Sequence, residues 1–386
     1  MSNDNRRAGK VSTLELERRW VAVRRAMERS RIDVLIMQTN NDYMGGYVKY
    51  FTDLPALNGY PVSVVFPLDE KMTWVRMGPK DGREDVPPDD ALRRGVQSVL
   101  TSPSFATVAQ TRLYDAALIA QAIRDVPHRT IGIVGTAQFP CAVADYLREA
   151  FPTSQFLEAS DLVDEIRAIK SAEEVDHIRE IAALQDAVMG TVFEEIEPGM
   201  RDRDVVALAQ FHSYKLGSEQ GIYGCASGPA EKPIRLGPPY LQNRVIEAGD
   251  QLILLIENNG SHAQFGEMGR TCVFGEIPRA LQLEFAFTLE AREFALDLLQ
   301  PGSIASEVAR RYNKFMVANG RAPESRVFAH SQGYDMVERP LIREDDSMTI
   351  AENMYFAVHP TYTHNGVSSW ICDNFLVSGA GRPERL

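Results

Sequence analysis

The sequence predicts two domains, an N-terminal α/β domain followed along the chain by an α+β domain. Three features indicate this arrangement. A chain of 386 residues with 44% hydrophobic residues is too long for a single ordinary core. In its first part, short apolar runs alternate with amphipathic segments, whereas the second part combines long amphipathic segments with strand-like runs around a hairpin turn. We place the boundary near residue 160, which gives domains of residues 1–160 and 161–386.

Regular alternation of helix and strand patterns defines the expected N-terminal domain. Residues 18–30 predict an amphipathic helix, because Trp20, Val23 and Met27 recur on one face. The remaining expected elements are the strand 32–39, the hairpin strands 61–68 and 72–77, the helix 116–124, the strand 130–135 and the helix 142–150. Such alternation is typical of a layered α/β sheet.

The expected C-terminal domain opens with a long helix. Ser171 and Glu174 have the spacing of a capping box, and Pro198-Gly199 ends the apolar repeat that follows. Further on, Asn258-Asn259-Gly260 is a strong hairpin-turn signal after a continuous apolar run. The other expected elements are the helix 203–216, a Gly/Pro-rich loop 224–239, the strand 251–257 with a return strand to 274, the helices 284–299 and 304–319, and the strands 354–361 and 369–377.

Composition narrows the choice of partners and compartment. The net charge is −12 and the pI about 5.2, and Lys and Arg form no stripe, so we exclude nucleic acid as a partner. No apolar run approaches the ~18–20 residues of a membrane-spanning helix, and no signal-peptide pattern opens the chain. The cysteines Cys141, Cys225, Cys272 and Cys372 show no paired spacing, which favours the reducing cytoplasm.

Six short motifs in the second part follow one another in the order found in a known family. They are residues 162–171, 198–199, 226–229, 249–250, 266–271 and 330–333. Through these motifs the chain resembles the creatinase/aminopeptidase P/methionine aminopeptidase superfamily. The resemblance implies a creatinase-type N-terminal α/β domain and a C-terminal pita-bread domain, in which helices cover a curved antiparallel sheet. It also implies a site where two Asp, one His and two Glu residues hold two metal ions.

The ligand positions implied by this resemblance are largely altered. The first Asp position falls on Ile256 or Leu255, neither of which can bind a metal. Glu257 lies one residue away, so in a regular strand it faces away from the site unless a β-bulge turns it inward. The other four positions carry, in chain order, Glu267, His330, His359 and Cys372. Because bridging carboxylates are lost, we do not expect a two-metal peptidase.

The remaining polar set predicts metal-independent chemistry. Creatinase, a member of this superfamily, binds no metal and cleaves a small C–N bond with His and Glu residues. We therefore expect a creatinase-like hydrolase without a cofactor, which cleaves a C–N bond in a small polar nitrogen-containing metabolite. The expected catalytic residues are Glu267, His330, His359 and Cys372, working by His/Glu acid–base chemistry with Cys372 or Glu267 as the candidate nucleophile.

Two alternatives stay open. One is a mononuclear metal-dependent hydrolase or lyase that acts on a small carboxylated metabolite, with Glu267, His330 and His359 as ligands of a single divalent ion. The other is a non-catalytic pseudo-peptidase that serves as a binding module.

The resemblance also implies substrate contacts and a dimer. The candidate substrate-binding residues are Glu257, Arg270, Tyr334, Tyr362 and Tyr47. Members of the superfamily usually dimerise, and the N-terminal domain of one subunit closes the site of the other. We therefore expect a cytoplasmic homodimer that binds a small-molecule substrate, with the segment around Tyr47 covering the partner's site and with no nucleic acid or membrane partner.

Overall fold

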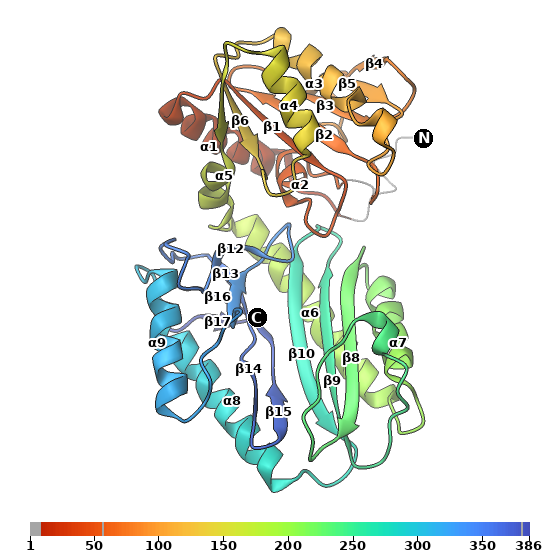
Figure 1. The fold of residues 1–386 in the computed structure, drawn as a ribbon, viewed down its shortest axis with the longest axis vertical. Helices are drawn as coiled ribbons and strands as arrows, with labels where there is room; N and C mark the ends of the chain where they lie inside the picture. Colours follow the sequence, from red (N-terminus) through yellow and green to blue (C-terminus); the bar gives the residue numbers. More distant parts are fainter. Residues whose placement is uncertain (1–8, 56–57, 380) are drawn as a thin grey trace. The chain divides into compact units, whose positions relative to one another are not determined.

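The protein is seen in a computed structural model that describes residues 9–55, 58–379 and 381–386. By its internal contacts the chain divides into two compact units, Met1–Arg167 and Ala168–Leu386. Figure 1 shows the elements of both units, coloured from red at the N-terminus to blue at the C-terminus. The first unit contains the α/β elements and the second the α+β elements, so both predicted classes are confirmed.

A seven-stranded mixed sheet forms the centre of the first unit, in the order β4-β5-β3-β2-β1-β6-β7. Its strands are β1 (Val34–Thr39), β2 (Val62–Pro67), β3 (Met72–Met77), β4 (Gly82–Asp85), β5 (Val96–Ser102), β6 (Thr130–Val134) and β7 (Gln155–Glu158). β1 is parallel to β6 and antiparallel to β2, which is antiparallel to β3, and β3 is parallel to β5. Strands β1, β3, β5 and β6 therefore end at the same edge of the sheet.

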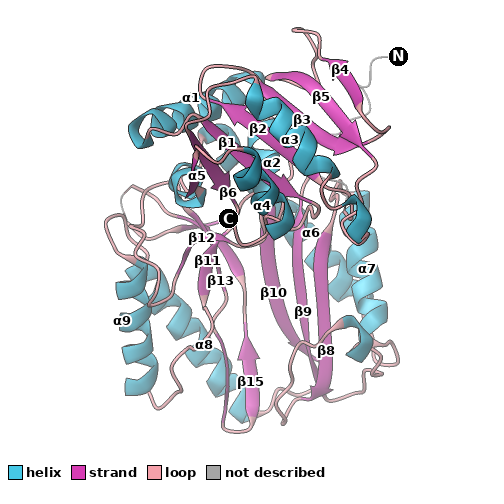
Figure 2. Cartoon of the chain, turned by 45° about the horizontal axis from the view of Figure 1, so that its top comes forward, coloured by secondary structure: helices cyan, strands magenta, loops and turns pink. Residues whose placement is uncertain are grey.

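Helices pack on both faces of this sheet (Figure 2). On one face, α3 (Tyr114–Arg124) and α4 (Cys141–Ala150) share a buried core with the central strands. Three other helices, α1 (Thr13–Ser30), α2 (Gly46–Thr52) and α5 (Ser160–Arg167), pack on one another and against β1, β2 and β6. A short 3₁₀ helix, η2 (Ala109–Thr111), precedes α3.

Local signals explain where α1 begins and ends. The Ser12 side chain accepts a hydrogen bond from the backbone N–H of Glu15, which caps the first turn. Arg31 adopts the left-handed conformation that closes the last turn. Trp20 and Met27 are buried on one face, as the periodicity predicts, so burial of this apolar stripe holds the helix in place.

The second unit contains two antiparallel sheets that meet edge to edge. One has the order β10-β9-β8, and the other the order β12-β11-β13-β16-β17. A bridge between Gly269 and Cys372, with N···O distances of 3.0 and 3.1 Å, joins β10 to the second sheet. The strands are β8 (Gly221–Pro229), β9 (Asp250–Asn259), β10 (Phe265–Val273), β11 (Ala329–Ser331), β12 (Glu338–Leu341), β13 (Tyr355–Val358), β16 (Asp373–Leu376) and β17 (Glu384–Arg385), and β14 (Thr361–His364) pairs separately with β15 (Val367–Trp370).

Two pairs of helices cover these sheets. α6 (Ala172–Glu195) and α7 (Asp202–Lys215) pack on β8, β9 and β10, while α8 (Arg279–Leu298) and α9 (Ala305–Ala318) pack on β11, β13 and β16 (Figures 1 and 2). Ser171 and Glu174 form the predicted capping box at the start of α6. A 3₁₀ helix, η3 (Pro239–Leu241), lies between β8 and β9. The opposite face of the sheets carries a smaller apolar cluster that includes Ile253, Trp370 and Cys372.

In the second unit, the expected loop 224–239, the expected turn 258–260 and the expected strand 369–377 differ from the structure, and the last is divided between β15 and β16. Residues 224–229, expected as part of a Gly/Pro-rich loop, lie instead in β8. Glycine is needed there because a Cβ on Gly228 would come 2.7 Å from Ile234, which belongs to a segment folded over this strand. The expected hairpin turn at residues 258–260 begins later, since β9 continues to Asn259 before the chain turns.

In the described part of the chain, no helix combines the length and the apolar character that crossing a membrane would require.

Candidate metal centre

Three segments of the second unit bring Glu267, His330 and His359 together. Each residue offers one ligand atom, and these atoms all lie within 4.8 Å of one another. Glu267 lies on β10, His330 on β11, and His359 directly follows β13. All three side chains are buried. The structure therefore gathers three of the four predicted catalytic residues at one point.

Strand pairing sets the direction of both imidazoles. His330 pairs with Ala357, so the two side chains share a face, and Ala357 belongs to the apolar cluster on the inner side of the sheets. His359 lies two residues beyond Ala357, and alternation along the strand returns it to that face. Its backbone N–H donates to the carbonyl of Phe328 at 2.8 Å, which anchors it beside β11.

A backbone contact indicates which nitrogen of His330 is free. Nδ1 lies 3.0 Å from the carbonyl oxygen of Ser331, which can only accept a hydrogen bond, so Nδ1 carries the proton. Nε2 then faces Oε2 of Glu267 at 3.3 Å. A neutral imidazole would direct a lone pair at the carboxylate, so this contact requires either a second proton on His330 or a cation between the two groups.

Burial and charge shift the pKa values in the directions that a cation site needs. Burial lowers the pKa of His359 to about 4, and the charge of Glu267 only partly opposes this, so His359 is neutral at pH 7. For Glu267, burial alone would raise the pKa, but the neighbouring imidazoles of His359 and His330 outweigh it and lower the pKa to about 2. Glu267 is therefore ionised at pH 7.

Glu257 faces the same site, contrary to the argument from a regular strand. It lies directly opposite Glu267 in the β9–β10 pairing, and directly opposed residues of antiparallel strands point to the same face. Ile256 pairs with Met268 and belongs to the helix-covered core. Burial, and then the nearby charge of Glu267, raise the pKa of Glu257 well above its usual range. Glu257 is therefore the carboxylate of the pair that retains a proton.

Cys372 does not have the properties expected of a nucleophile. Its side chain is fully buried, and its thiol donates a hydrogen bond to the backbone carbonyl of Glu267 at 3.4 Å. Burial, followed by the charges of Glu267 and Asp373, raises the pKa of this thiol well above its usual range. A nucleophilic cysteine needs an accessible thiolate, so the structure assigns Cys372 to the packing between β10 and β16.

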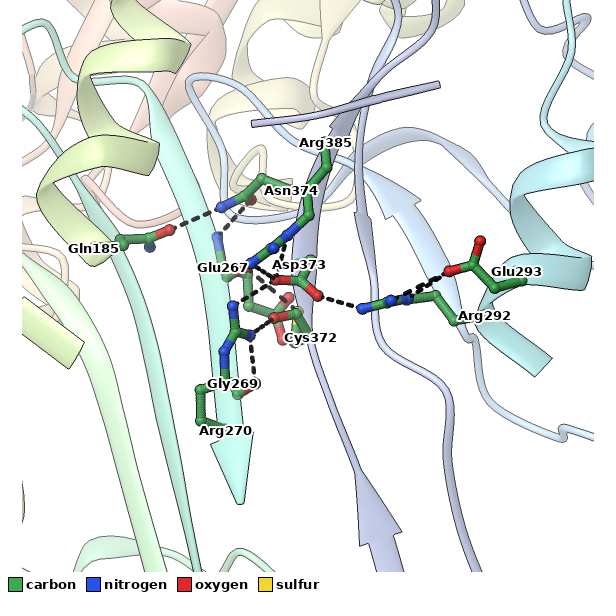
Figure 3. A network of polar contacts seen from close by, with 10 residues as sticks. All are labelled: Gln185, Glu267, Gly269, Arg270, Arg292, Glu293, Cys372, Asp373, Asn374 and Arg385. Atoms are coloured by element: carbon green, nitrogen blue, oxygen red, sulfur yellow. Dashed lines mark hydrogen bonds and ion pairs between the residues drawn. The ribbon is translucent and has the colours of Figure 1, made fainter. Parts of the chain in front are cut away.

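A buried amide network that the sequence did not reveal holds Glu267 in place (Figure 3). Oδ1 of Asn374 accepts hydrogen bonds from the backbone N–H of Glu267 at 3.0 Å and from the Tyr355 hydroxyl at 2.7 Å. Its Nδ2 donates to Gln185 on α6 at 2.9 Å. The only indication in the sequence was that Asn374 lies two residues after Cys372, which occupies the last ligand position implied by the family resemblance.

Arg270 does not reach the site, so its expected role in substrate binding is wrong. It lies three residues after Glu267 and therefore emerges on the opposite face of β10. There it donates to the Cys372 carbonyl at 2.7 Å and pairs with Asp373 at 2.6 Å. Figure 3 shows that Arg292 and Arg385 converge on the same buried carboxylate. Arg270 therefore braces β10 against β16, and Asp373 in turn links β16 to α8 and to the C-terminal strand.

Two of the three candidate tyrosines are committed to internal contacts. The Tyr362 hydroxyl donates to the carbonyl of Glu284 at 2.7 Å, and its ring packs edge-on against Phe287. In the first unit, the Tyr47 hydroxyl donates to Asp164 at 2.9 Å, under the guanidinium of Arg167. Tyr334 is buried with 2% of its surface exposed. Internal hydrogen bonds therefore hold the hydroxyls of Tyr362 and Tyr47, and Tyr334 is buried within the second unit.

Comparison with known proteins identifies the family. Residues 176–379, more than half of the chain, match the model of metallopeptidase family M24, and residues 19–169 match the creatinase/prolidase N-terminal domain. The chain belongs to metallopeptidase family M24, a family of hydrolases. The resemblance to the creatinase and aminopeptidase P family is thereby confirmed.

Individual relatives agree with this assignment. The uncharacterized hydrolase/peptidase y4tM of Sinorhizobium fredii is 27% identical over 82% of this chain and 80% of its own length. The Xaa-Pro dipeptidase of Pyrococcus furiosus is 25% identical over 60% of this chain and 66% of its own length. Among solved structures, the prolidase from Pyrococcus horikoshii covers 95% of this chain and 97% of its own at a TM-score of 0.74 and 19% identity. The X-Pro aminopeptidase from Thermotoga maritima covers 94% and 96% at a TM-score of 0.76 and 16% identity, which shows the shared fold.

The expected metal-independent cleavage of a non-peptide C–N bond is wrong, as is the expected absence of a cofactor. Membership of a metallopeptidase family contradicts both, and so does the clustering of Glu267, His330 and His359 with the spacing of a metal site. Although several carboxylates of the two-metal site are lost, one carboxylate and two imidazoles are sufficient ligands for one divalent ion.

Proposed function

We propose that this protein is a metal-dependent peptidase that acts on short peptides, with one divalent ion held by Glu267, His330 and His359. The proposal is supported mainly by the close approach of these three buried side chains, whose ligand atoms lie within 4.8 Å of one another. Relatives named Xaa-Pro dipeptidase and peptidase support the class of substrate. A dipeptide with proline in the second position is therefore the first substrate to test.

The ligand set fits a single transition-metal ion. Two imidazoles and one carboxylate are typical of catalytic zinc, and the same set suits other divalent metals of intermediate hardness. His359 is neutral and Glu267 ionised at pH 7, so both are in the state that binds a cation. When bound, such an ion activates a water molecule and polarises the carbonyl of the peptide bond.

The chain's own groups supply the rest of the chemistry. The Ser331 carbonyl holds His330 with Nε2 directed at the site. Glu257 retains a proton beside Glu267, so it can donate that proton to a leaving amine and act as the general acid. Leu255 packs with the inner apolar cluster that also contains Ile253 and Trp370, and this wall excludes bulk water.

The test combines metal content with hydrolysis, using protein purified without a histidine tag. We expect about one equivalent of a divalent metal by elemental mass spectrometry, and hydrolysis of one or more dipeptides from a panel that includes Xaa-Pro sequences. Both should be lost in His330→Ala and kept in His212→Ala, a matched control in which a histidine on α7 is removed. Below about 0.1 equivalents of metal, with hydrolysis unchanged in His330→Ala, the proposal is wrong.

A further inference from the structure

A cavity lies at the edge of the first unit's sheet where its parallel strands end. It has a volume of about 220 Å³ and is formed by residues that end β1, follow β5, and begin α3 and α4. In open α/β sheets, the carboxyl ends of the strands are the usual place for a ligand, because loops and helix starts surround a crevice there. None of its lining residues belongs to the metal centre in the second unit.

At this cavity lies a buried carboxylate without a counter-charge. Asp115 is 3% exposed and accepts hydrogen bonds from the Ser102 hydroxyl at 2.8 Å and the Gln38 amide at 3.4 Å. Among the described residues, no lysine, arginine or histidine forms an ion pair with it. Burial raises the pKa of Asp115, and hydrogen bonds from Ser102 and Ser104 only partly oppose this. An unpaired buried charge is costly, and a cation from solution would relieve that cost.

The cavity also offers a positive group away from Asp115. Arg112 lines it with an exposed side chain that donates to the Ala109 carbonyl at 3.0 Å, and no described carboxylate pairs with this guanidinium. Nearby, α4 begins at Cys141 after Pro140, whose side chain cannot accept a hydrogen bond from the first turn. These donors favour a carboxylate, whereas Asp115 favours an ammonium group.

We propose that this cavity binds a small zwitterion of the free α-amino-acid type. The ammonium group of the ligand pairs with Asp115, and its carboxylate pairs with Arg112 and the start of α4. Phe105 and Val143 give the lining an apolar part that accepts an aliphatic side chain. The volume suits one such molecule and is smaller than the cavities that hold drug-sized ligands. The proposal stands whether or not the second unit is a peptidase.

The first test compares three probes that share one side chain. Isothermal titration calorimetry on the full-length protein uses L-leucine, L-leucinamide, which lacks the carboxylate, and 4-methylpentanoate, which lacks the ammonium group. We expect one leucine per chain, and binding at least about 30-fold weaker for each of the other two. Equal binding of leucine and leucinamide would overturn the pairing with Arg112, and no binding at about 10 mM leucine would overturn the whole proposal.

Variants then locate the ligand within the molecule. Asp115→Asn keeps the shape of the side chain and should weaken leucine binding by at least about 30-fold, as should Arg112→Gln, which alters only an exposed side chain. The matched controls Asp145→Asn and Arg148→Gln remove an exposed pair from α4 and should leave binding unchanged. Because amino acids also chelate metals, His330→Ala serves as a further check. Leucine binding that survives Asp115→Asn but is lost in His330→Ala would place the ligand at the metal centre and contradict the proposal.

Discussion

Glu257 and Glu267 occupy directly opposed positions on β9 and β10, so two carboxylates emerge on one buried face. Like charges this close cannot both be fully ionised, and the environment separates the pair. Imidazoles stabilise the ionised form of Glu267, whereas burial and the neighbouring charge raise the pKa of Glu257. One carboxylate is thereby suited to bind a cation and the other to carry a proton.

This division of roles predicts opposite behaviour for two conservative substitutions. Glu267→Gln removes the ionised ligand, and we expect the metal content to fall from about one equivalent to below about 0.1. Glu257→Gln preserves a neutral polar group of the same shape, so we expect the metal to remain while kcat falls at least about 100-fold with KM little changed. Elemental mass spectrometry and steady-state kinetics on both variants check this. Loss of the metal in Glu257→Gln alone would reverse the assignment.

The contacts of Asn374 predict an effect on metal affinity without any contact to the metal. Its Oδ1 holds the backbone of Glu267 and the hydroxyl of Tyr355. Removing such supporting contacts typically costs ~10–100-fold in metal affinity. We expect a decrease of this size in Asn374→Ala, measured by competition with a chromophoric chelator. Asn319→Ala, which removes an exposed amide bonded to the Phe315 carbonyl, is the control and should bind the metal normally. Equal affinities in the two variants would show that Asn374 only stabilises the fold.

The sequence located the candidate metal ligands, because each of them depends on a local motif. Glu267, His330 and His359 each lie within a short segment whose spacing fixes the residue on its strand, and the structure brings all three together. The sequence left the orientation of Glu257 open, because this orientation depends on the register across the hairpin. A shift of one residue moves every side chain to the other face, and the number of residues in the turn decides that register.

Local sequence patterns did not predict contacts between segments that are far apart in the chain. The hydrogen bond from Glu267 to Asn374 spans 107 residues, and nothing in either segment alone indicates it. Arg270 was assigned to substrate because an arginine near a site suggests an anion. Strand alternation from Glu267 would have placed it on the far face, against Asp373. Periodicity and motif spacing therefore predicted the longer helices, several strands and the three candidate ligands, whereas the short elements, the supporting contacts and the register required the structure.

The lowered pKa of Asp346 predicts that the stability of the second unit depends on pH. Asp346 is 6% exposed, pairs with Arg339 at 2.7 Å and accepts backbone hydrogen bonds from Leu341 and Met348. Burial alone would raise its pKa, but these partners lower it below the ordinary value of 3.8 for an aspartate. A lowered pKa in the folded state means that Asp346 contributes stability above pH 3.8, and that this contribution disappears as the pH falls through the folded-state pKa.

Asp346→Asn should therefore destabilise the protein by about 1–3 kcal/mol at pH 7, and by progressively less as the pH falls below the unfolded-state value. Urea unfolding across this range of pH measures the difference. The neighbouring Asp345→Asn, which removes an exposed carboxylate paired with Arg343, should leave the unfolding curve unchanged at every pH. A constant difference between Asp346→Asn and the wild type at all pH values would show that ionisation of Asp346 does not contribute.

We expect one methyl group added at Gly269, in Gly269→Ala, to affect both the stability of the fold and the metal centre. A Cβ at this position would lie 1.8 Å from the indole of Trp370, which is buried, so the ring or the strand must move. The backbone of Gly269 is bonded on both sides to Cys372, which joins the two sheets next to Glu267. We expect Gly269→Ala to destabilise the protein by about 1–3 kcal/mol, because overpacking a filled core forces its neighbours out of position.

The same substitution at Gly190 should have the opposite sign. Gly190 is exposed on α6, and a Cβ there would meet nothing within 4 Å. Alanine in a helix is favoured over glycine by roughly 0.5–1 kcal/mol, so we expect Gly190→Ala to stabilise the second unit by about that amount. Urea unfolding of both variants, followed by their metal content, separates two explanations. Destabilisation with loss of metal in Gly269→Ala alone ties the sheet junction to the site, whereas unchanged metal content would show that the ligands keep their positions despite the strained junction.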